Sequence, residues 1–328
     1  RSVRQVEEIT EIIGAQRLIQ LAGSPLATGF QAATIRWFQQ ERPELWQQTA
    51  TVLAPKDYLR WRLTGEFGSE PSDGSGTLLL DVRQRNWSDE LLETLDIDRG
   101  LLPVVRPSTT IAGYLGRRPA RQLGLPAGIP VVNGAADTAC SQLGAGVVSE
   151  KALLLTISSG GQLVAPAAKV TIDLGGRLHT FCGAAEPTGS HPGWYQMAAI
   201  LSAGFSLRWL RDQVFELKGA GAYEAMTALA EQSTPGANGL LFLPYLLGER
   251  SPHMDPFARG QFLGLTAEHG RVELVRAVME GVVLACLDAH SVLAEVGVKP
   301  ERIIMAGGGA RSRLWRQIVA DVFDLRVR

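Results

Sequence analysis

Apolar and polar residues in the second half of the chain are arranged in blocks that predict strands and helices in turn. Residues 152–157 (ALLLTI) form a continuous apolar run, which predicts a central β-strand. The SSGG segment at 158–161 predicts a tight turn into the next strand. Later, helical periodicity predicts a long amphipathic helix over 272–293, a strand over 302–306 and, after three glycines, a helix over 312–323. Recurrence of strand, glycine turn and helix is typical of an α/β fold.

The first half predicts shorter helices. Helical periodicity covers residues 32–40 and 56–63. Pro55 suits the start of the second helix, because its missing N–H has no partner there in any case, and Gly65 suits its end.

Three further segments of the first half carry local signals. Residues 70–76 (EPSDGSG) predict a turn-rich loop before an apolar run. Ser88 is placed to cap a helix over 89–95. Residues 126–132 predict a short buried strand.

Composition narrows the class of protein. The chain has 328 residues, of which 45% are hydrophobic and 20% charged, so it can bury a large core and is not of a disordered type. Its net charge of -1 gives no electrostatic footprint for nucleic acid or an anionic membrane. Three widely spaced cysteines predict no disulfide framework, which favours a reducing cytoplasm. No signal peptide or membrane span is predicted.

The length predicts two domains, which we place at residues 1–147 and 148–328. The chain starts at Arg1 without a Met and stops at Arg328, where a helix passes into a predicted strand. We therefore expect both ends to lie inside a larger protein.

Asp137 is the first candidate for chemistry. It lies in the segment NGAADTAC at 133–140, which is predicted to lead from a strand into a helix. One interpretation is a first-turn carboxylate stabilised by the helix dipole. The other is a general base at the carboxyl end of a strand, where open α/β sheets bind ligands. The segment alone favours the first.

Two glycine-bearing turns are candidates for ligand binding. The turn of Ser158, Ser159 and Gly160 is either an ordinary hairpin or a concavity whose hydroxyl and N–H groups bind phosphate. The segment GGGARS at 307–312 matches neither GxGxxG nor GxxxxGK[ST]. Its glycines still allow either close approach to a nucleotide at a helix N-terminus or tight packing.

Other residue types give weaker signals. The five histidines, His191 among them, show no metal-ligand spacing, so we predict no metal site made by protein ligands. Cys140 has no histidine nearby in the sequence and is predicted to be a buried thiol rather than a nucleophile.

Five segments together resemble one known family, the FGGY family of carbohydrate kinases. The segment GQFLGL at 260–265, followed by ELVRAVME at 273–280, resembles the second family signature, and LPYLLGERSPH at 243–253 precedes it as in the family. The segments VLAPKDYLR at 52–60 and LDVRQRNWSD at 80–89 resemble the members that act on D-xylulose. The resemblance extends over essentially the whole chain.

The resemblance implies a fold of two actin-like (ribonuclease H-like) domains with ATP and sugar in the cleft between them. It also implies that the first domain is incomplete, because the Asp-x-Gly-Thr phosphate loop of the family is absent and a comparable segment is missing at the other end. The implied activity is ATP-dependent phosphorylation of D-xylulose to D-xylulose 5-phosphate.

By the same resemblance, individual residues acquire roles. Asp137 is the implied catalytic base. Ser158, Ser159 and Gly160 match the phosphate-binding hairpin of the family, and the adenosine-binding turn is matched by Gly308, Gly309 and Ser312. The implied cofactors are ATP and Mg²⁺. The expected partner is a small sugar, a pentulose, with no nucleic acid and no membrane; a homodimer is left open.

The chain also departs from the family pattern. Ile157 stands where the family hairpin usually has Gly, and Ala33-Thr34 replaces the Pro-Lys of the first signature. Two alternatives therefore stay open. One is another FGGY kinase, acting on ribulose, gluconate or glycerol, and the other is a non-catalytic actin-like module that binds nucleotide. For the chain as given we expect weak or no kinase activity.

Overall fold

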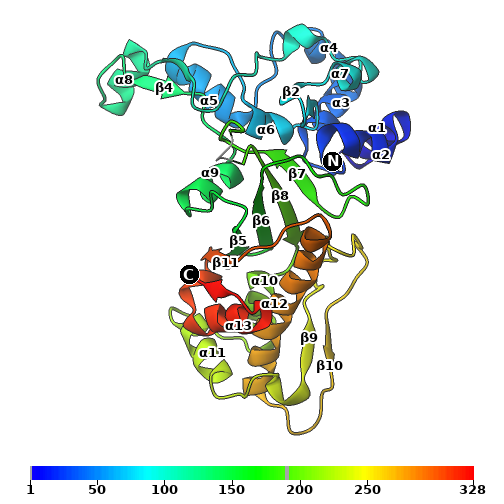
Figure 1. Ribbon diagram of the computed structural model, residues 1–328, viewed down its shortest axis with the longest axis vertical. Coiled ribbons are helices and arrows are strands. Elements are labelled where there is room, and N and C mark those ends of the chain that lie inside the picture. The colour runs from blue at the N-terminus through cyan, green and yellow to red at the C-terminus, as the bar shows by residue number, and fades with distance from the viewer. Residues whose placement is uncertain (1, 189–191) are drawn as a thin grey trace. The chain divides into compact units, whose positions relative to one another are not determined.

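The computed structural model describes residues 2–188 and 192–328, and its element order is shown in Figure 1. The chain divides into two compact units and passes between them three times. Unit 1 consists of Arg1–Gly144 and Pro166–Gln196, and unit 2 of Ala145–Ala165 and Met197–Arg328. The domain boundary predicted from the sequence, between residues 147 and 148, is near the first of these passages.

Unit 1 is mainly helical. Its elements are α1 (Val3–Ile13), α2 (Ala15–Ala22), α3 (Gln31–Glu41), α4 (Pro43–Trp46), α5 (Pro55–Thr64), α6 (Pro71–Ser75), β1 (Leu80–Asp81), β2 (Asn86–Trp87), α7 (Asp89–Thr94), η1 (Arg99–Leu101), β3 (Ile111–Tyr114), α8 (Arg117–Leu123), β4 (Pro130–Val132), α9 (Asp137–Gly144) and β7 (His179–Cys182). Its core is a cluster of fully buried aliphatic side chains that includes Ile9, Leu78, Leu79, Leu80 and Leu91.

The helices predicted in the first half are confirmed. Helix α3 covers the predicted segment 32–40, and α5 begins at Pro55 and ends at Gly65 in the left-handed conformation that glycine adopts without strain. Helix α7 is capped by Ser88, whose side chain accepts a hydrogen bond from the Leu91 N–H.

Two predictions for unit 1 were wrong. Residues 70–76 are not a loop: Pro71 begins the short helix α6, because the Glu70 carboxylate caps it by accepting the Ser72 and Asp73 N–H groups. The strand predicted over 126–132 is shorter, β4, and is not buried. It pairs with β3 in a two-stranded ribbon that is separate from the six-stranded sheet.

Unit 2 is built around a mixed sheet. Its elements are β5 (Ala152–Ile157), β6 (Gly161–Ala167), β8 (Trp194–Ile200), α10 (Gly204–Trp209), η2 (Leu210–Val214), α11 (Ala222–Ala230), η3 (Ala237–Gly239), β9 (Leu241–Leu243), β10 (Gln261–Leu263), α12 (Arg271–Glu295), β11 (Arg302–Ala306), η4 (Gly309–Arg311), α13 (Arg313–Phe323) and β12 (Arg326–Val327). Strands β6 and β8 each extend from unit 2 into unit 1.

The sheet order is β12-β11-β5-β6-β8, and β7 of unit 1 is the last neighbour of β8. Strand β5 pairs antiparallel with β6 through the predicted hairpin and parallel with β11 on its other side. The prediction of a central, buried strand over 152–157 is therefore confirmed. The predicted α/β class is confirmed as well.

Helix α12 forms the core of unit 2. It packs against β9, α10, α11 and α13, as Figure 1 also shows, and buries Val275, Val278, Met279 and Val282. It is the one helix in the described ranges that is long and apolar enough to cross a membrane, but 61% of the relevant window is buried inside the protein. Such burial is typical of the core helix of a globular domain.

Candidate functional site

Asp137 is the first residue of α9, and its side chain is exposed. The predicted position in the first helical turn is therefore confirmed. Its Oδ1 accepts hydrogen bonds from the Thr138 N–H (2.6 Å) and from the Thr138 hydroxyl (3.3 Å). The carboxylate is thus favoured by the helix dipole and remains open to a ligand, so the geometry suits both interpretations of this residue.

The loop that leads to Asp137 is fixed to the body of unit 1. Asn133 is 2% exposed, and its carbonyl oxygen accepts hydrogen bonds from Lys56 Nζ (3.3 Å) and Arg60 Nη1 (3.0 Å). Its side-chain Nδ2 donates to the Pro107 carbonyl oxygen (3.0 Å). Both cations come from α5, so this helix positions the start of the loop.

The same two cations join a buried group of acids. Lys56 Nζ lies 2.7 Å from Asp57 Oδ1, 3.5 Å from Glu70 Oε1 and 3.9 Å from Asp73 Oδ2, and Arg60 Nη1 lies 3.1 Å from Asp57 Oδ1. Asp57, Arg60 and Glu70 are almost completely buried. Three carboxylates and two cations leave an excess of negative charge around the segment before α9 if all are ionised.

Asp73 responds to this charge. The pKa of its carboxyl is raised to about 6, mainly by burial; Lys56 opposes the shift, and the nearby Glu70, Asp57 and Asp137 carboxylates contribute to it. Lys56 does not cancel the rise in the Asp73 pKa, because its Nζ lies as far as 3.9 Å from Asp73 Oδ2. Asp137 therefore lies close enough to Asp73 for their charges to interact.

Lys56, Glu70, Ser72 and Asp73 were not among the candidate residues predicted from the sequence. A signal was present: a carboxylate cap, a Pro at the first helical position and an acid in the first turn are together typical of a helix start. The three glycine and serine residues that follow concealed it, because they favour turns.

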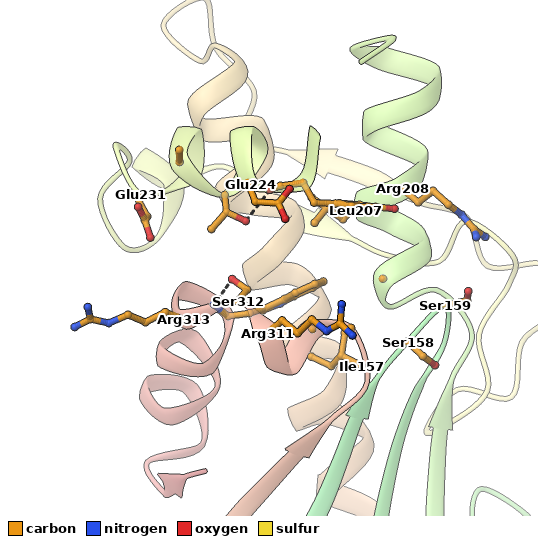
Figure 2. A pocket seen from close by; sticks show the side chains of 17 residues that line it. Ile157, Ser158, Ser159, Leu207, Arg208, Glu224, Glu231, Arg311, Ser312 and Arg313 are labelled. Atoms are coloured by element: carbon orange, nitrogen blue, oxygen red, sulfur yellow. Dashed lines mark hydrogen bonds between the residues drawn. The ribbon is translucent and has the colours of Figure 1, made fainter. Parts of the chain in front are cut away.

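Unit 2 contains a pocket of about 600 Å³ formed at the predicted glycine turns (Figure 2). Five of the six predicted cofactor-binding residues line it, namely Ser158, Ser159, Gly308, Gly309 and Ser312. The sixth, Gly160, does not; a Cβ there would lie 2.9 Å from the Ile200 carbonyl oxygen, so Gly160 permits close backbone approach to β8. Asp137 belongs to unit 1.

The carbonyl groups of the hairpin are already bonded. Ser158 O accepts the Gly204 N–H (2.7 Å), and Ser159 O accepts the N–H groups of Ala203 and Phe205 (both 3.0 Å) at the start of α10. The Ser158 and Ser159 side chains are exposed. The Ser158 hydroxyl donates to the Gly160 carbonyl oxygen (3.2 Å), and both serines line the pocket.

The second glycine turn combines packing and access. Gly309 is buried, and a Cβ there would lie 2.6 Å from both Cβ and Cγ2 of Ile157, which also lines the pocket. Gly308 has open space around it. Ser312 caps α13 by accepting the Trp315 N–H (3.2 Å), so one acceptor position of its hydroxyl is occupied. The two interpretations, ligand approach and tight packing, thus apply to different glycines.

Charged side chains complete the pocket. Arg208 comes from α10, Arg311 from η4 and Arg313 from α13, while Glu224 and Glu231 come from α11 and the residue after it (Figure 2). A volume of this size is within the range of small-ligand sites, and three guanidinium groups suit an anionic ligand.

Metal-ligating residues do not cluster: no group of three or more His, Cys, Asp or Glu suited to a metal ion occurs within residues 2–188 and 192–328. His191 lies outside the described residues. Mg²⁺ commonly binds through one or two carboxylates together with phosphate oxygens. A Mg²⁺ ion that binds together with a nucleotide would therefore take most of its ligands from phosphate oxygens and water.

The prediction of a buried thiol at Cys140 was wrong. Cys140 is exposed, with Sγ 3.6 Å from the Ala135 carbonyl oxygen. It lies three positions after Asp137 and so shares the exposed face of α9, whereas Ala139 and Gln142 are the buried residues of this helix.

Comparison with protein families gives two matches. Residues 1–144 match the N-terminal domain, and residues 173–328 the C-terminal domain, of the FGGY family of carbohydrate kinases.

Individual relatives extend these matches. The chain is 39% identical to a xylulose kinase of Escherichia coli over 302 residues, or 92% of this chain and 60% of that protein. It is 30% identical to a gluconokinase of Bacillus subtilis over 335 residues, or 100% of this chain and 64% of that protein. The crystal structure of a Rhodospirillum rubrum xylulose kinase superimposes with a TM-score of 0.90 at 30% identity, over 100% of this chain and 65% of that one.

Two facts follow from these relatives. The predicted two-domain, actin-like kinase fold is confirmed. The chain spans 60% of the length of the Escherichia coli relative and 64% of the length of the Bacillus subtilis relative.

Proposed function

This chain belongs to the FGGY family of carbohydrate kinases, and we propose that the complete protein transfers the γ-phosphoryl group of ATP to D-xylulose, giving ADP and D-xylulose 5-phosphate. The observation that carries the chemistry is the exposed Asp137 carboxylate at the start of α9, on a loop fixed by α5. The choice of sugar rests on the relatives, several of which are xylulose kinases at 33–39% identity.

Asp137 acts as the general base. As the sugar hydroxyl oxygen forms its bond to the γ-phosphorus, the carboxylate takes the hydroxyl proton, and the bond between the γ-phosphorus and the leaving ADP oxygen breaks. The transition state of such transfers is loose, so the protein contributes mainly by orienting the hydroxyl and stabilising charge. The Thr138 N–H, bonded to Asp137 Oδ1, would hold the carboxylate in place.

The pocket of unit 2 holds the nucleotide in this proposal. The Ser158 and Ser159 hydroxyls face the phosphates, and Gly308, Gly309 and Ser312 form the wall beside the adenosine, with Gly160 shaping the hairpin. Mg²⁺ would arrive with the ATP phosphates and supply charge neutralisation there. The proposed binding partner of the protein is a small sugar, and the proposed location is the cytoplasm.

One alternative keeps the chemistry and changes the sugar. A gluconokinase of Bacillus subtilis is among the relatives, so gluconate is a specific rival to D-xylulose. A phosphorylation screen of the complete protein over pentuloses, gluconate and glycerol, with release of ADP as the readout, separates them. A clear preference for gluconate or glycerol would refute the proposed substrate.

The base is tested by Asp137→Asn in the complete protein. We expect kcat to fall by at least ~10²-fold, the usual scale for loss of a general base, with ATP affinity nearly unchanged. Near-normal turnover would exclude Asp137 as the base. Binding of ATP without turnover in the unmodified protein would instead favour a non-catalytic module.

A further inference from the structure

The backbone N–H of Ala136, the residue directly before Asp137, is bonded to a side chain from another element. It donates to the Ser72 Oγ at 2.9 Å. Ser72 belongs to α6 and is 2% exposed, so this bond is shielded from water. It fixes the end of the loop, whereas Lys56 and Arg60 fix the beginning, at Asn133.

The Ser72 hydroxyl is itself oriented. It donates to Glu70 Oε2 at 2.8 Å, so its single proton is engaged and its lone pairs face the Ala136 N–H. Hydrogen bonds to a carboxylate are stronger than those between neutral groups, and a hydroxyl that donates becomes a better acceptor.

The Glu70 carboxylate is held from several sides. It is fully buried, and it accepts the N–H groups of Ser72 (2.7 Å) and Asp73 (2.8 Å) as well as the Ser108 hydroxyl (2.8 Å). Lys56 Nζ lies 3.5 Å from its other oxygen, Oε1. A carboxylate fixed in this way cannot turn away when the loop moves.

We propose that Ser72, oriented by Glu70, is a positioning residue for the Asp137 carboxylate. This inference rests on the proposed function of Asp137. Ser72 touches neither the sugar nor the nucleotide in this scheme; it acts by holding the amide before α9, and so the direction in which the first residue of the helix presents its side chain. Because small displacements of a reacting group can cost as much as 10²-fold in rate, a loosened loop should lower kcat.

The experiment compares Ser72→Ala with a matched control, Ser108→Ala. Both changes remove one hydroxyl donor from Glu70 Oε2, but only Ser72→Ala removes the acceptor of the Ala136 N–H. The Ser108 backbone carbonyl, which accepts the Gly134 N–H, is kept in both. Ser72→Thr retains a hydroxyl and serves as the conservative variant.

In the complete protein, we expect Ser72→Ala to lower kcat roughly tenfold or more with little change in the KM for ATP, because a mispositioned base affects the transition state and not nucleotide binding. Ser108→Ala should keep kcat within about twofold of wild type, and Ser72→Thr should restore most of the rate.

Three outcomes would overturn the proposal: equal kcat for Ser72→Ala and Ser108→Ala, no rescue by Ser72→Thr, or unfolding of Ser72→Ala, which would make Ser72 a requirement of the fold. Asp137→Asn is measured in parallel. If that variant retains turnover, the proposed function itself fails; if it is inactive while Ser72→Ala matches its control, only the positioning role fails.

Discussion

Gly309 and Gly308 offer a sharp test of the packing in unit 2, since they are adjacent and both line the pocket of that unit. A Cβ at position 309 would lie 2.6 Å from two carbons of Ile157 and 3.3 Å from Trp315 Cε3. Carbon atoms prefer separations of about 3.5–4.0 Å, so the overlap with Ile157 is roughly 1 Å. Overfilling a close-packed core costs about 1–3 kcal/mol. Gly309→Ala should therefore destabilise unit 2 by that amount.

Gly308→Ala is the matched control. Gly308 has φ of -63° and ψ of -36°, which any residue adopts, and a Cβ there meets nothing within 4 Å. The change should be neutral or stabilise by up to about 1 kcal/mol, through the lower entropy of the unfolded chain.

The assay is thermal unfolding followed by calorimetry. For a protein of this size each kcal/mol shifts Tm by about 2–4 °C, so Gly309→Ala should melt roughly 2–12 °C lower, and Gly308→Ala at or slightly above wild type. In an Ile157→Gly background both clashing atoms are absent, and the Ala at 309 should then cost little. Equal melting of the two single variants would refute the reasoning, because Ile157 would then have moved aside.

Two further predictions concern buried carboxyls. The pKa of Asp73 is raised from 3.8 to about 6 in the folded protein. As pH rises, this carboxyl loses its proton in the unfolded chain before it does in the folded protein, so the stability of wild type falls between about pH 4 and pH 6. Asp73→Asn should remove that fall. The full shift corresponds to roughly 3 kcal/mol, and partial exposure reduces it to about 1–2 kcal/mol, measurable by urea titrations at pH 4 and pH 7. A constant difference between the two proteins across this range would contradict it. Glu249 is 3% exposed and burial raises its pKa; Oε1 accepts the Leu201 and Arg250 N–H groups, while Oε2 has no partner among the described residues. Glu249→Gln keeps those bonds and removes the buried charge. It should therefore gain stability relative to wild type between pH 4 and pH 7 in the same titrations, and a loss between these two pH values would exclude this account.

Regular elements could be predicted from the sequence where one local pattern dominates. The apolar run at β5, the glycine hairpin after it and the caps of α5 and α7 are all local, and the structure confirms each of them. The strand β4 was predicted to be buried because it is apolar, but burial depends on whether another layer covers it, and none does. The pattern of apolar residues therefore predicts that a strand forms, whereas its exposure to solvent depends on tertiary packing.

The pocket of unit 2 shows the same limit. The glycine turns at 158–160 and 307–309 could be identified as candidates, yet each had two interpretations: the sequence favoured an ordinary hairpin at the first turn and did not choose between ligand approach and packing at the second. Coordinates separate them: Gly309 is required by Ile157, and Gly308 is not constrained by any neighbour. The bulk of Ile157 is accommodated by the absence of a side chain at 309.

Asp137 could be found from its own segment, because a carboxylate at the start of a helix is a local feature. The groups that hold it could not. Ser72 is 64 residues from the amide that it binds, and it lies in a helix whose glycine and serine residues predict a turn. The Glu70 carboxylate makes that helix by capping it and, with the same oxygen, orients the Ser72 hydroxyl. One buried carboxylate therefore both forms α6 and fixes the loop before α9. It follows that Glu70→Gln, which retains an acceptor but loses the charge, should weaken the helix and the loop together.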